Sequence, residues 1–319
     1  MIKQIILSSI CVSLMNSAFA TTVLRFAHAH PQTDSQHKAA EFFAEEVKNK
    51  SKGELEVKIF PNGQLGNDNA MIDAVRGGMI DFELSGNPYF TGMAPELNAL
   101  DIPFLFKDAS AAYNVLDGQI GKELLGKLSA HGLVGLAFWE IGFRDLTNNI
   151  RPVQKAEDVK GLALRTTPNP IHLAFFSALG ANPTPMPFAE VYTSLETKTI
   201  DGQENPVNLI KSAGLETVQK YLSRTKHAYT AAPLVMNKKK FDSLNEENKR
   251  VVIDAAFAAA KYQRELNAKQ EADNLAFLKE KGMVVNEELD RESFKAIAQD
   301  AINKAVKGKP AEEYFKKNS

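Results

Sequence analysis

Short alternating apolar runs and longer stretches with helical spacing follow one another along the N-terminal part of the chain. Leu24 and Phe26 share one face of a predicted strand, and Ala39–Val47 carries apolar residues at helical spacing. Leu55–Ile59 alternates again, so the chain opens with a β-α-β unit. This alternation predicts an α/β protein with parallel strands and helices on both faces of the sheet. The same criteria predict further helices at residues 69–76 and 109–128 and strands at 80–84 and 133–139.

A polar stretch at residues 147–161 interrupts this rhythm, and a second α/β set follows it. That set has a predicted strand at 162–165 and predicted helices at 170–179 and 188–197. A nearly unbroken helical pattern covers residues 245–279, which corresponds to about 50 Å of helix and is long enough to brace two lobes. We therefore expect two lobes: an N-terminal lobe of residues 21–143, to which about 231–270 return, and a C-terminal lobe of 144–230 with about 271–319.

The first twenty residues have the pattern of a secretory signal peptide. Lys3 precedes the apolar segment Ile5–Met15, and Ala18-Phe19-Ala20 has the small residues of a cleavage site, so cleavage is expected after Ala20. The single cysteine, Cys11, lies in the removed segment. No later segment reaches the 18 apolar residues of a membrane span. We expect an exported protein without a disulfide or a membrane segment of its own, located in a bacterial periplasm.

Composition narrows the classes of partner. The 319 residues are 44% hydrophobic and 24% charged, which is ordinary for a globular chain of about two domains. Lys and Arg number 38 against 39 Asp and Glu, so the net charge is −1. Such a balance provides no broad basic field, and we expect no nucleic-acid partner.

A search for catalytic motifs gives little support for an enzyme. The sequence has no G-x-S-x-G elbow, no H-E-x-x-H helix and no glycine-rich phosphate loop. His28 and His30 share a face of the first strand, but no third metal ligand lies near them, which favours a cleft-lining or solvated pair. We expect no metal and no cofactor. An exported enzyme that acts on the same ligands is kept as an alternative.

Two arginines follow consecutive predicted strands. Arg165 ends the apolar strand 162–164, and Arg144 follows the apolar run 138–143. Ligands of parallel α/β sheets bind beyond the carboxyl ends of the strands, and a guanidinium group there can clamp a carboxylate with two hydrogen bonds. For either arginine alone a surface salt bridge is the simpler interpretation, and the occurrence of two strengthens the hypothesis of an anion site.

Seven segments in order resemble the periplasmic solute-binding proteins of tripartite ATP-independent periplasmic (TRAP) transporters, of the DctP type. This resemblance implies a two-lobed periplasmic binding protein fold with a cleft between the lobes and a long helix that spans both. It also implies that the lobes close over an anionic ligand, which is delivered to the TRAP membrane permease subunits. The segments are Leu24–His28, Phe60–Gly66, Asp101–Phe106, Gly142–Arg144, Lys160–Arg165, Asn182–Met186 and Asp201–Pro206.

The resemblance also assigns ligand-binding residues. It implies that Arg165 pairs with the ligand carboxylate, that Asn205 donates to the same group, and that Arg144 is a second cationic contact. In this comparison Phe188 packs against the ligand. From the N-terminal lobe, the expected cleft residues are His28, Asp68, Ser85 and Asn87.

Ligand class is inferred from differences within the family. Gly86 and Tyr89 stand where sialate-binding members have a glutamate and an arginine, which disfavours sialate. The segments 32–37, 75–78, 90–92 and 185–192 are similar to members that bind 2,3-diketogulonate. However, His28 replaces an expected tyrosine and Asn205 an expected histidine, so gulonate or a hexuronate such as glucuronate is as plausible as diketogulonate. A C4-dicarboxylate is the alternative, and it would need cationic groups at both ends of the pocket.

Overall fold

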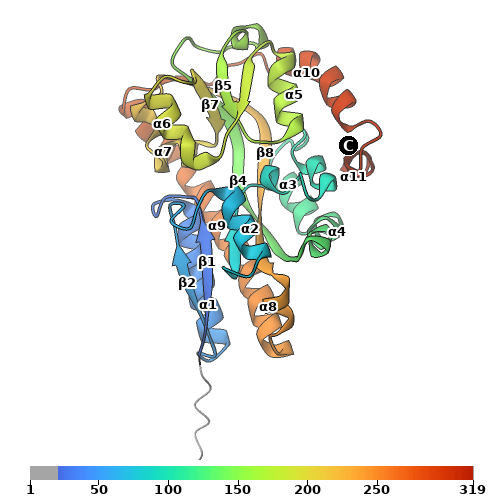
Figure 1. Cartoon of the computed structure of the whole chain (residues 1–319). Helices are drawn as coiled ribbons and strands as arrows, with labels where there is room; N and C mark the ends of the chain where they lie inside the picture. Colours follow the sequence, from blue (N-terminus) through green and yellow to red (C-terminus); the bar gives the residue numbers. More distant parts are fainter. Residues whose placement is uncertain (1–20, 319) are drawn as a thin grey trace, which may run out of the picture.

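One mixed sheet forms the centre of the protein. The computed structural model describes residues 21–318, so the expected signal peptide lies outside the described residues. The sheet has nine strands in the order β2-β1-β3-β8-β4-β7-β5-β6, and β9 pairs with β8 (Figure 1). The strands are β1 Thr22–His28, β2 Leu55–Phe60, β3 Phe82–Leu84, β4 Leu133–Asn148, β5 Ala163–Thr166, β6 Asn182–Pro185, β7 Gly202–Asn205, β8 Tyr221–Asn237 and β9 Val284–Asn286.

Two long strands connect the lower and upper halves of the sheet as drawn in Figure 1. β4 and β8 pair antiparallel from Leu133↔Asn237 to Asn148↔Tyr221, with β1, β2 and β3 on the lower side and β5, β6 and β7 on the upper side. The expectation of an all-parallel sheet is therefore wrong. β1 pairs parallel with β2 and β3, and β5 with β6 and β7, but β3–β8, β4–β8 and β4–β7 are antiparallel. The chain leaves the lower half through β4 and returns through β8, so these strands must run in opposite directions.

Helices cover both faces of the sheet, as the alternating pattern predicts (Figure 1). In the lower half, α1 and α9 pack on one face and α2, α3 and α4 contribute to the core on the other. The expected lobe boundary at residues 143–144 falls within β4 and stays a prediction. The helices are α1 Ser35–Lys50, α2 Asp68–Arg76, α3 Ala109–Leu116, α4 Gln119–Lys127, α5 Pro170–Ala178, α6 Val191–Glu196, α7 Val207–Ser212, α8 Lys238–Asp242, α9 Glu246–Glu280, α10 Arg291–Val306 and α11 Ala311–Asn318.

The single helix expected at residues 109–128 is divided into α3 and α4. Gly118 has an extended backbone and forms the N-cap of α4. The carboxylate of Asp117 accepts two hydrogen bonds from Arg264 of α9, at 2.6 and 3.0 Å. This contact ties the break to the long helix, which helical periodicity along one segment cannot reveal.

The long helix is confirmed and lies against both halves of the protein. α9 has 35 residues, and the side chain of Asn245 caps its first turn. It packs against α1 and β4 below and α7 above. Small buried residues such as Ala255, Ala256 and Ala259 allow close approach to the sheet, and Trp139 Nε1 donates to the Ala256 carbonyl at 3.0 Å. The helix therefore braces the junction of the two halves.

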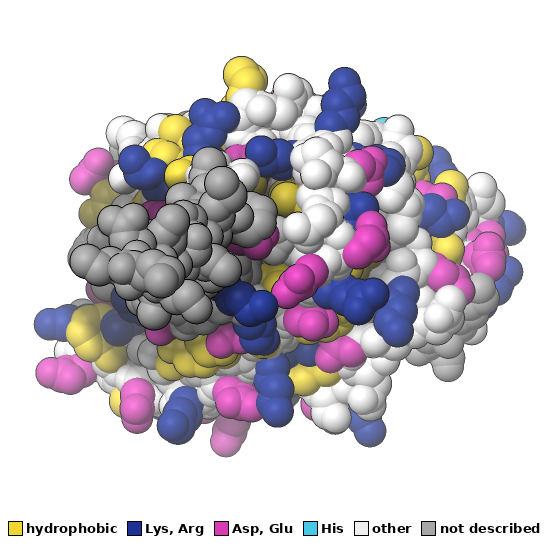
Figure 2. Space-filling view, turned by 90° about the horizontal axis from the view of Figure 1, so that it is seen from below, with side chains coloured by type: hydrophobic (Ala, Val, Ile, Leu, Met, Phe, Trp, Pro, Cys, Tyr) yellow, Lys and Arg dark blue, Asp and Glu magenta, His cyan; other side chains and the backbone are white. Residues whose placement is uncertain are grey.

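Charged side chains are mixed on the lower face of the molecule. Figure 2 shows Lys and Arg interspersed with Asp and Glu over the part of this face that described residues form. Pairs such as Lys238–Asp242 and Lys52–Glu247 match opposite charges at the surface. Neither sign gathers into a broad field on this visible part, in keeping with the net charge of −1.

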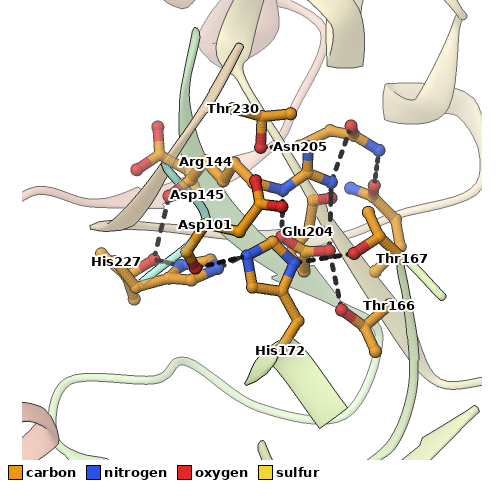
Figure 3. A network of polar contacts seen from close by, with 12 residues as sticks. Asp101, Arg144, Asp145, Thr166, Thr167, His172, Glu204, Asn205, His227 and Thr230 are labelled. Atoms are coloured by element: carbon orange, nitrogen blue, oxygen red, sulfur yellow. Dashed lines mark hydrogen bonds and ion pairs between the residues drawn. The ribbon is translucent and has the colours of Figure 1, made fainter. Parts of the chain in front are cut away.

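A buried carboxyl group links the two halves next to the sheet. Asp101 Oδ2 accepts hydrogen bonds from Asn87 at 2.7 Å and from Asn169, the N-cap of α5, at 2.8 Å. The backbone carbonyl of Asp101 lies 3.1 Å from His172 Nε2, and Figure 3 shows both residues beside Arg144 and Glu204. Burial raises the pKa of Asp101 to about 8. Asp101 is therefore held as a neutral acid in the folded protein at neutral pH.

A buried glutamine at the junction gives a first stability test. Gln263 of α9 accepts from the Glu140 backbone N–H at 2.9 Å and donates to the Glu140 carbonyl at 2.7 Å, beside a bulge in β4. Gln263→Ala should lower the free energy of unfolding by about 2–4 kcal/mol, because these buried groups lose a partner. Urea denaturation measures the change. Gln270→Ala on the same helix is the matched control, and an equal loss in both variants would contradict this role.

The raised pKa of Asp101 gives a second test. Because the folded-state pKa is about 8 and the ordinary value is 3.8, Asp101 favours the folded state most at low pH, and this contribution is lost as pH rises through 8. Asp101→Asn keeps a neutral acceptor for Asn87 and Asn169. In thermal melts, the melting temperature of the variant minus that of wild type should therefore increase as the pH rises from 5 to 8.5. Parallel pH profiles for the two proteins would show that Asp101 does not bind the proton.

Candidate functional site

Side chains from both halves of the sheet line a narrow cavity. The upper half contributes the ends of β5 and β7, and the lower half contributes the segments that follow β1 and β3. The strand ends thus converge as the sequence predicts for an α/β ligand site. The lining residues are His30, Asp68, Gly86, Pro88, Tyr89, Ile141, Arg144, Arg165, Thr167, Phe188, Asn205, Leu209 and Thr230.

A second cavity is a poorer candidate for binding an anion. Its charged lining residues are Glu140 and Glu271. The carboxylate of Glu140 already accepts hydrogen bonds from Tyr113, Tyr229 and Asn267, each at 2.9 Å. Carboxylates on its wall repel an anion, so we assign the site to the cavity that holds the arginines.

Arg165 is a buried cation at the end of β5. Its Nε and Nη2 both donate to the Met186 carbonyl, at 2.9 and 2.6 Å, and Nη2 also donates to Tyr89 Oη at 3.1 Å. These contacts fix the plane of the guanidinium group. Within residues 21–318, no carboxylate forms an ion pair with Arg165. Because burying an unpaired charge is costly, this group is suited to bind an anion.

Tyr89 supplies a neutral hydroxyl group to the cavity. Its oxygen accepts from Arg165 and, at 3.1 Å, from the Phe188 backbone N–H. Burial raises the pKa of Tyr89 above its ordinary value, and the nearby Asp68 carboxylate acts in the same direction. The hydroxyl therefore keeps its proton, and that proton has no acceptor among the described residues. Tyr89 can donate to a bound oxygen.

Arg144 lines the cavity but has an internal partner. Its guanidinium group forms a buried ion pair with Glu204, and Nη1 donates to Thr230 Oγ1 at 3.3 Å (Figure 3). Burial opposes ionisation of Glu204, but Arg144 and a hydrogen bond with His227 hold the pKa of its carboxyl well below the ordinary value. The charge of Arg144 is thus compensated within the protein.

Asn205 is held by the same network. Its Oδ1 accepts from Arg144 Nη2 at 3.0 Å, and its Nδ2 donates to Gln203 Oε1 at 2.5 Å. β7 therefore presents the amide group to the cavity in a fixed orientation. The expected upper-half residues Arg165, Arg144, Asn205 and Phe188 are brought together around one cavity.

The lower half supplies an acceptor and an aromatic surface. Asp68, at the start of α2, accepts from Ser85 Oγ at 3.0 Å through Oδ1, while its buried Oδ2 has no hydrogen-bond partner among the described residues. His30 stacks on Phe188 with ring centroids 5.4 Å apart and an interplanar angle of 18°. The cavity thus offers a carboxylate oxygen and an aromatic pair that bridges the halves.

Three expected residues lie behind the cavity wall. His28 is fully buried, with Nε2 3.1 Å from His37 Nδ1, and burial lowers its pKa well below the ordinary value. Ser85 holds Asp68, and Asn87 donates to Asp101 and to the Leu97 carbonyl. His28, Ser85 and Asn87 are therefore not among the residues that line this cavity, and their contact with a ligand stays a prediction. Ser85 holds the lining residue Asp68, and His28 Nδ1 accepts from the His30 backbone N–H at 3.2 Å.

Sequence reasoning missed Tyr89 as a lining residue and left His30 open as either cleft-lining or solvated. His30 lies two residues beyond His28, and β1 ends at His28, so the strand pattern no longer determines its direction. Tyr89 follows Pro88 in the short helix Asn87–Tyr89, and the sequence used Tyr89 itself only to argue against sialate. Its position immediately after β3, at a strand end, is the signal that could have identified it.

Comparisons with known proteins show the family to which the chain belongs. The sequence profile of the bacterial extracellular solute-binding proteins, family 7 (DctP), matches residues 26–309. The 2,3-diketo-L-gulonate-binding periplasmic protein YiaO of Escherichia coli K12 is 47% identical over 291 residues, which cover 91% of this chain and 88% of that protein. Among residues 21–318, no helix has both the length and the apolar character needed to span a membrane.

Two solved structures share the fold closely. A TRAP periplasmic solute-binding protein from Polaromonas sp. JS666, bound to D-erythronate, has a TM-score of 0.91 and 37% identity, and the match covers 93% of this chain and 98% of that chain. The sugar acid binding protein DctPAm from Advenella mimigardefordensis, in complex with galactonate, has a TM-score of 0.89 and 36% identity, covering 94% and 99%. The chain therefore belongs to the DctP family, the periplasmic solute-binding proteins of TRAP transporters.

Proposed function

We propose that this protein captures a six-carbon sugar acid through its carboxylate and delivers it to the TRAP membrane permease subunits. The ligand class comprises gulonate, diketogulonate and hexuronates. The protein acts in the periplasm after removal of residues 1–20, and it binds its ligand without catalysis and without a cofactor. The ligands of YiaO and DctPAm, 2,3-diketo-L-gulonate and galactonate, support this class.

The observation that carries the proposal is the buried Arg165 without a carboxylate partner among residues 21–318. A sugar acid brings one carboxylate, and the guanidinium group can meet it with directed hydrogen bonds. Asn205 and Arg144 line the same cavity as Arg165, and Glu204 compensates the charge of Arg144. The carboxylate end of the ligand therefore binds to the upper half.

The rest of the cavity suits a hydroxylated chain. Asp68 Oδ2 can accept a hydrogen bond from a ligand hydroxyl, and the Tyr89 hydroxyl can donate one. The stacked rings of His30 and Phe188 can pack against C–H groups of the ligand. Ser85 and His28 support Asp68 and His30 from behind the wall.

A C4-dicarboxylate fits this chemistry less well. Its second carboxylate would need a second cation, but the Arg144 charge is matched by Glu204, and Asp68 adds a negative charge to the lining. Burial of an unpaired second carboxylate beside Asp68 is strongly unfavourable. Preferential binding of a dicarboxylate is therefore the result that the binding tests must exclude.

Removal of the arginine tests the anchor. Arg165→Ala should weaken sugar-acid binding by roughly 30- to 4,000-fold, because loss of one partner of a buried charge-assisted pair costs about 2–5 kcal/mol of binding free energy. Arg165→Lys should also bind poorly, since a point charge cannot reproduce the planar fork. Isothermal titration calorimetry measures both, with the exposed Arg250→Ala as the matched control. A loss below fivefold in Arg165→Ala would refute the anchor.

A ligand panel tests the class. Gulonate, diketogulonate, galactonate or glucuronate should bind roughly tenfold or more tightly than succinate, malate or fumarate, because the second carboxylate lacks a partner. Thermal-shift screening followed by calorimetry ranks the acids. Micromolar binding of succinate with no response to six-carbon acids would overturn the ligand class and leave the family assignment intact.

A further inference from the structure

One serine hydroxyl lies between two buried carboxyl groups behind the cavity. Ser85 Oγ is 3.0 Å from Asp68 Oδ1, and it makes a shorter contact with Glu83 Oε1. A serine hydroxyl has one proton and can donate to only one of two acceptors. The other contact needs a proton on a carboxyl group, so this cluster holds one proton more than two ionised carboxylates would allow.

The surroundings favour Glu83 as the group that holds the proton. Glu83 is fully buried in β3, and among the described residues no cation forms an ion pair with it and no donor reaches its Oε2. Burial raises its pKa well above the ordinary value and, with the Asp68 carboxylate, outweighs the opposing hydrogen bond from Ser85. Asp68 instead begins α2, where the N-terminal end of a helix favours a negative charge.

We propose that Glu83 is a neutral positioning residue that fixes Asp68 for recognition of a ligand hydroxyl. The Glu83 O–H donates to Ser85 Oγ, and Ser85 O–H donates to Asp68 Oδ1. Each donor then has one acceptor. The proton on Glu83 sets the direction of both hydrogen bonds, from Glu83 to Ser85 and from Ser85 to Asp68. Asp68 Oδ2, buried and without a partner among residues 21–318, is left as the acceptor at the cavity.

The consequence is selectivity for a hydroxyl donor. A ligand hydroxyl can donate to Asp68 Oδ2, whereas an unsubstituted alkyl chain leaves this buried oxygen unsatisfied. Residues that act on Asp68 from behind should therefore change the preference for hydroxylated acids more than the affinity for carboxylates in general. This inference rests on the proposed sugar-acid function.

The test compares two ligands in full-length mature protein by calorimetry. The hydroxylated ligand is whichever of galactonate, gulonate and glucuronate binds wild type most tightly, and hexanoate is its counterpart without hydroxyls. Asp68→Asn should reduce the ratio of the two affinities by about tenfold, because a charged acceptor is lost. Glu83→Leu and Ser85→Ala should each reduce it by about fivefold, the equivalent of one net hydrogen bond.

Rescue by a neutral donor separates positioning from simple damage. Glu83→Gln should keep the wild-type ratio, because its amide N–H can donate to Ser85 Oγ, and the exposed Glu56→Gln is the matched control. A wild-type ratio in Ser85→Ala and Glu83→Leu overturns the proposal, and so does an equal loss for both ligands. A Gln variant as impaired as Leu also overturns it. Failure of wild type to bind any hydroxylated acid would instead overturn the proposed function.

Discussion

The antiparallel pairing of β4 with β8 is the constraint on which the rest of the structure depends. These strands of 16 and 17 residues belong to both halves of the sheet. The strands of the lower half join the pair through β8, and those of the upper half join it through β4. Three irregularities interrupt their register, one of them at Glu140/Gly142. There α9 supplies Gln263 to the backbone of Glu140. The cavity lies along this junction because both halves end their strands there.

The balance of buried charge leaves one cation of the cavity without a carboxylate partner among residues 21–318. In the upper half, Arg144 and Glu204 neutralise each other within a network of hydrogen bonds. Arg165 is fixed by neutral oxygens of Met186 and Tyr89, and so its full charge remains for a ligand. A buried cation that is held only by neutral groups carries a desolvation free energy in the ligand-free protein. Binding of an anion offsets this cost. Recognition of a carboxylate is thereby coupled to the stability of the site.

The sequence allows local elements to be predicted better than the contacts between them. The α9 pattern has no breaker over its whole length, and Arg165 lies at the end of β5, so both were predictable. Arg144 instead lies within β4, which continues to Asn148, so the expectation that it follows a strand is wrong. β8 was not predicted, because polar residues such as Ser223 and Thr225 are buried by partners distant in sequence. The pairing of Arg144 with Glu204 joins residues 60 positions apart, and no local pattern records it. A strand end alone does not determine which side chains reach the cavity: Arg165 at the end of β5 lines it, whereas His28 at the end of β1 is buried behind it.

Gly86 gives this cavity a place where its shape can change without loss of its anchor. A Cβ atom there would lie 3.1 Å from Ile141 Cδ1, the mobile end of a side chain, and 3.5 Å from the Thr230 methyl group. The backbone at Gly86 is an ordinary extended conformation, open to any residue. By contrast, replacement of Arg144 leaves Glu204 charged and buried. New ligand preferences in this scaffold can therefore arise by single substitutions on the lower wall, while the upper wall tolerates change only when several residues alter together.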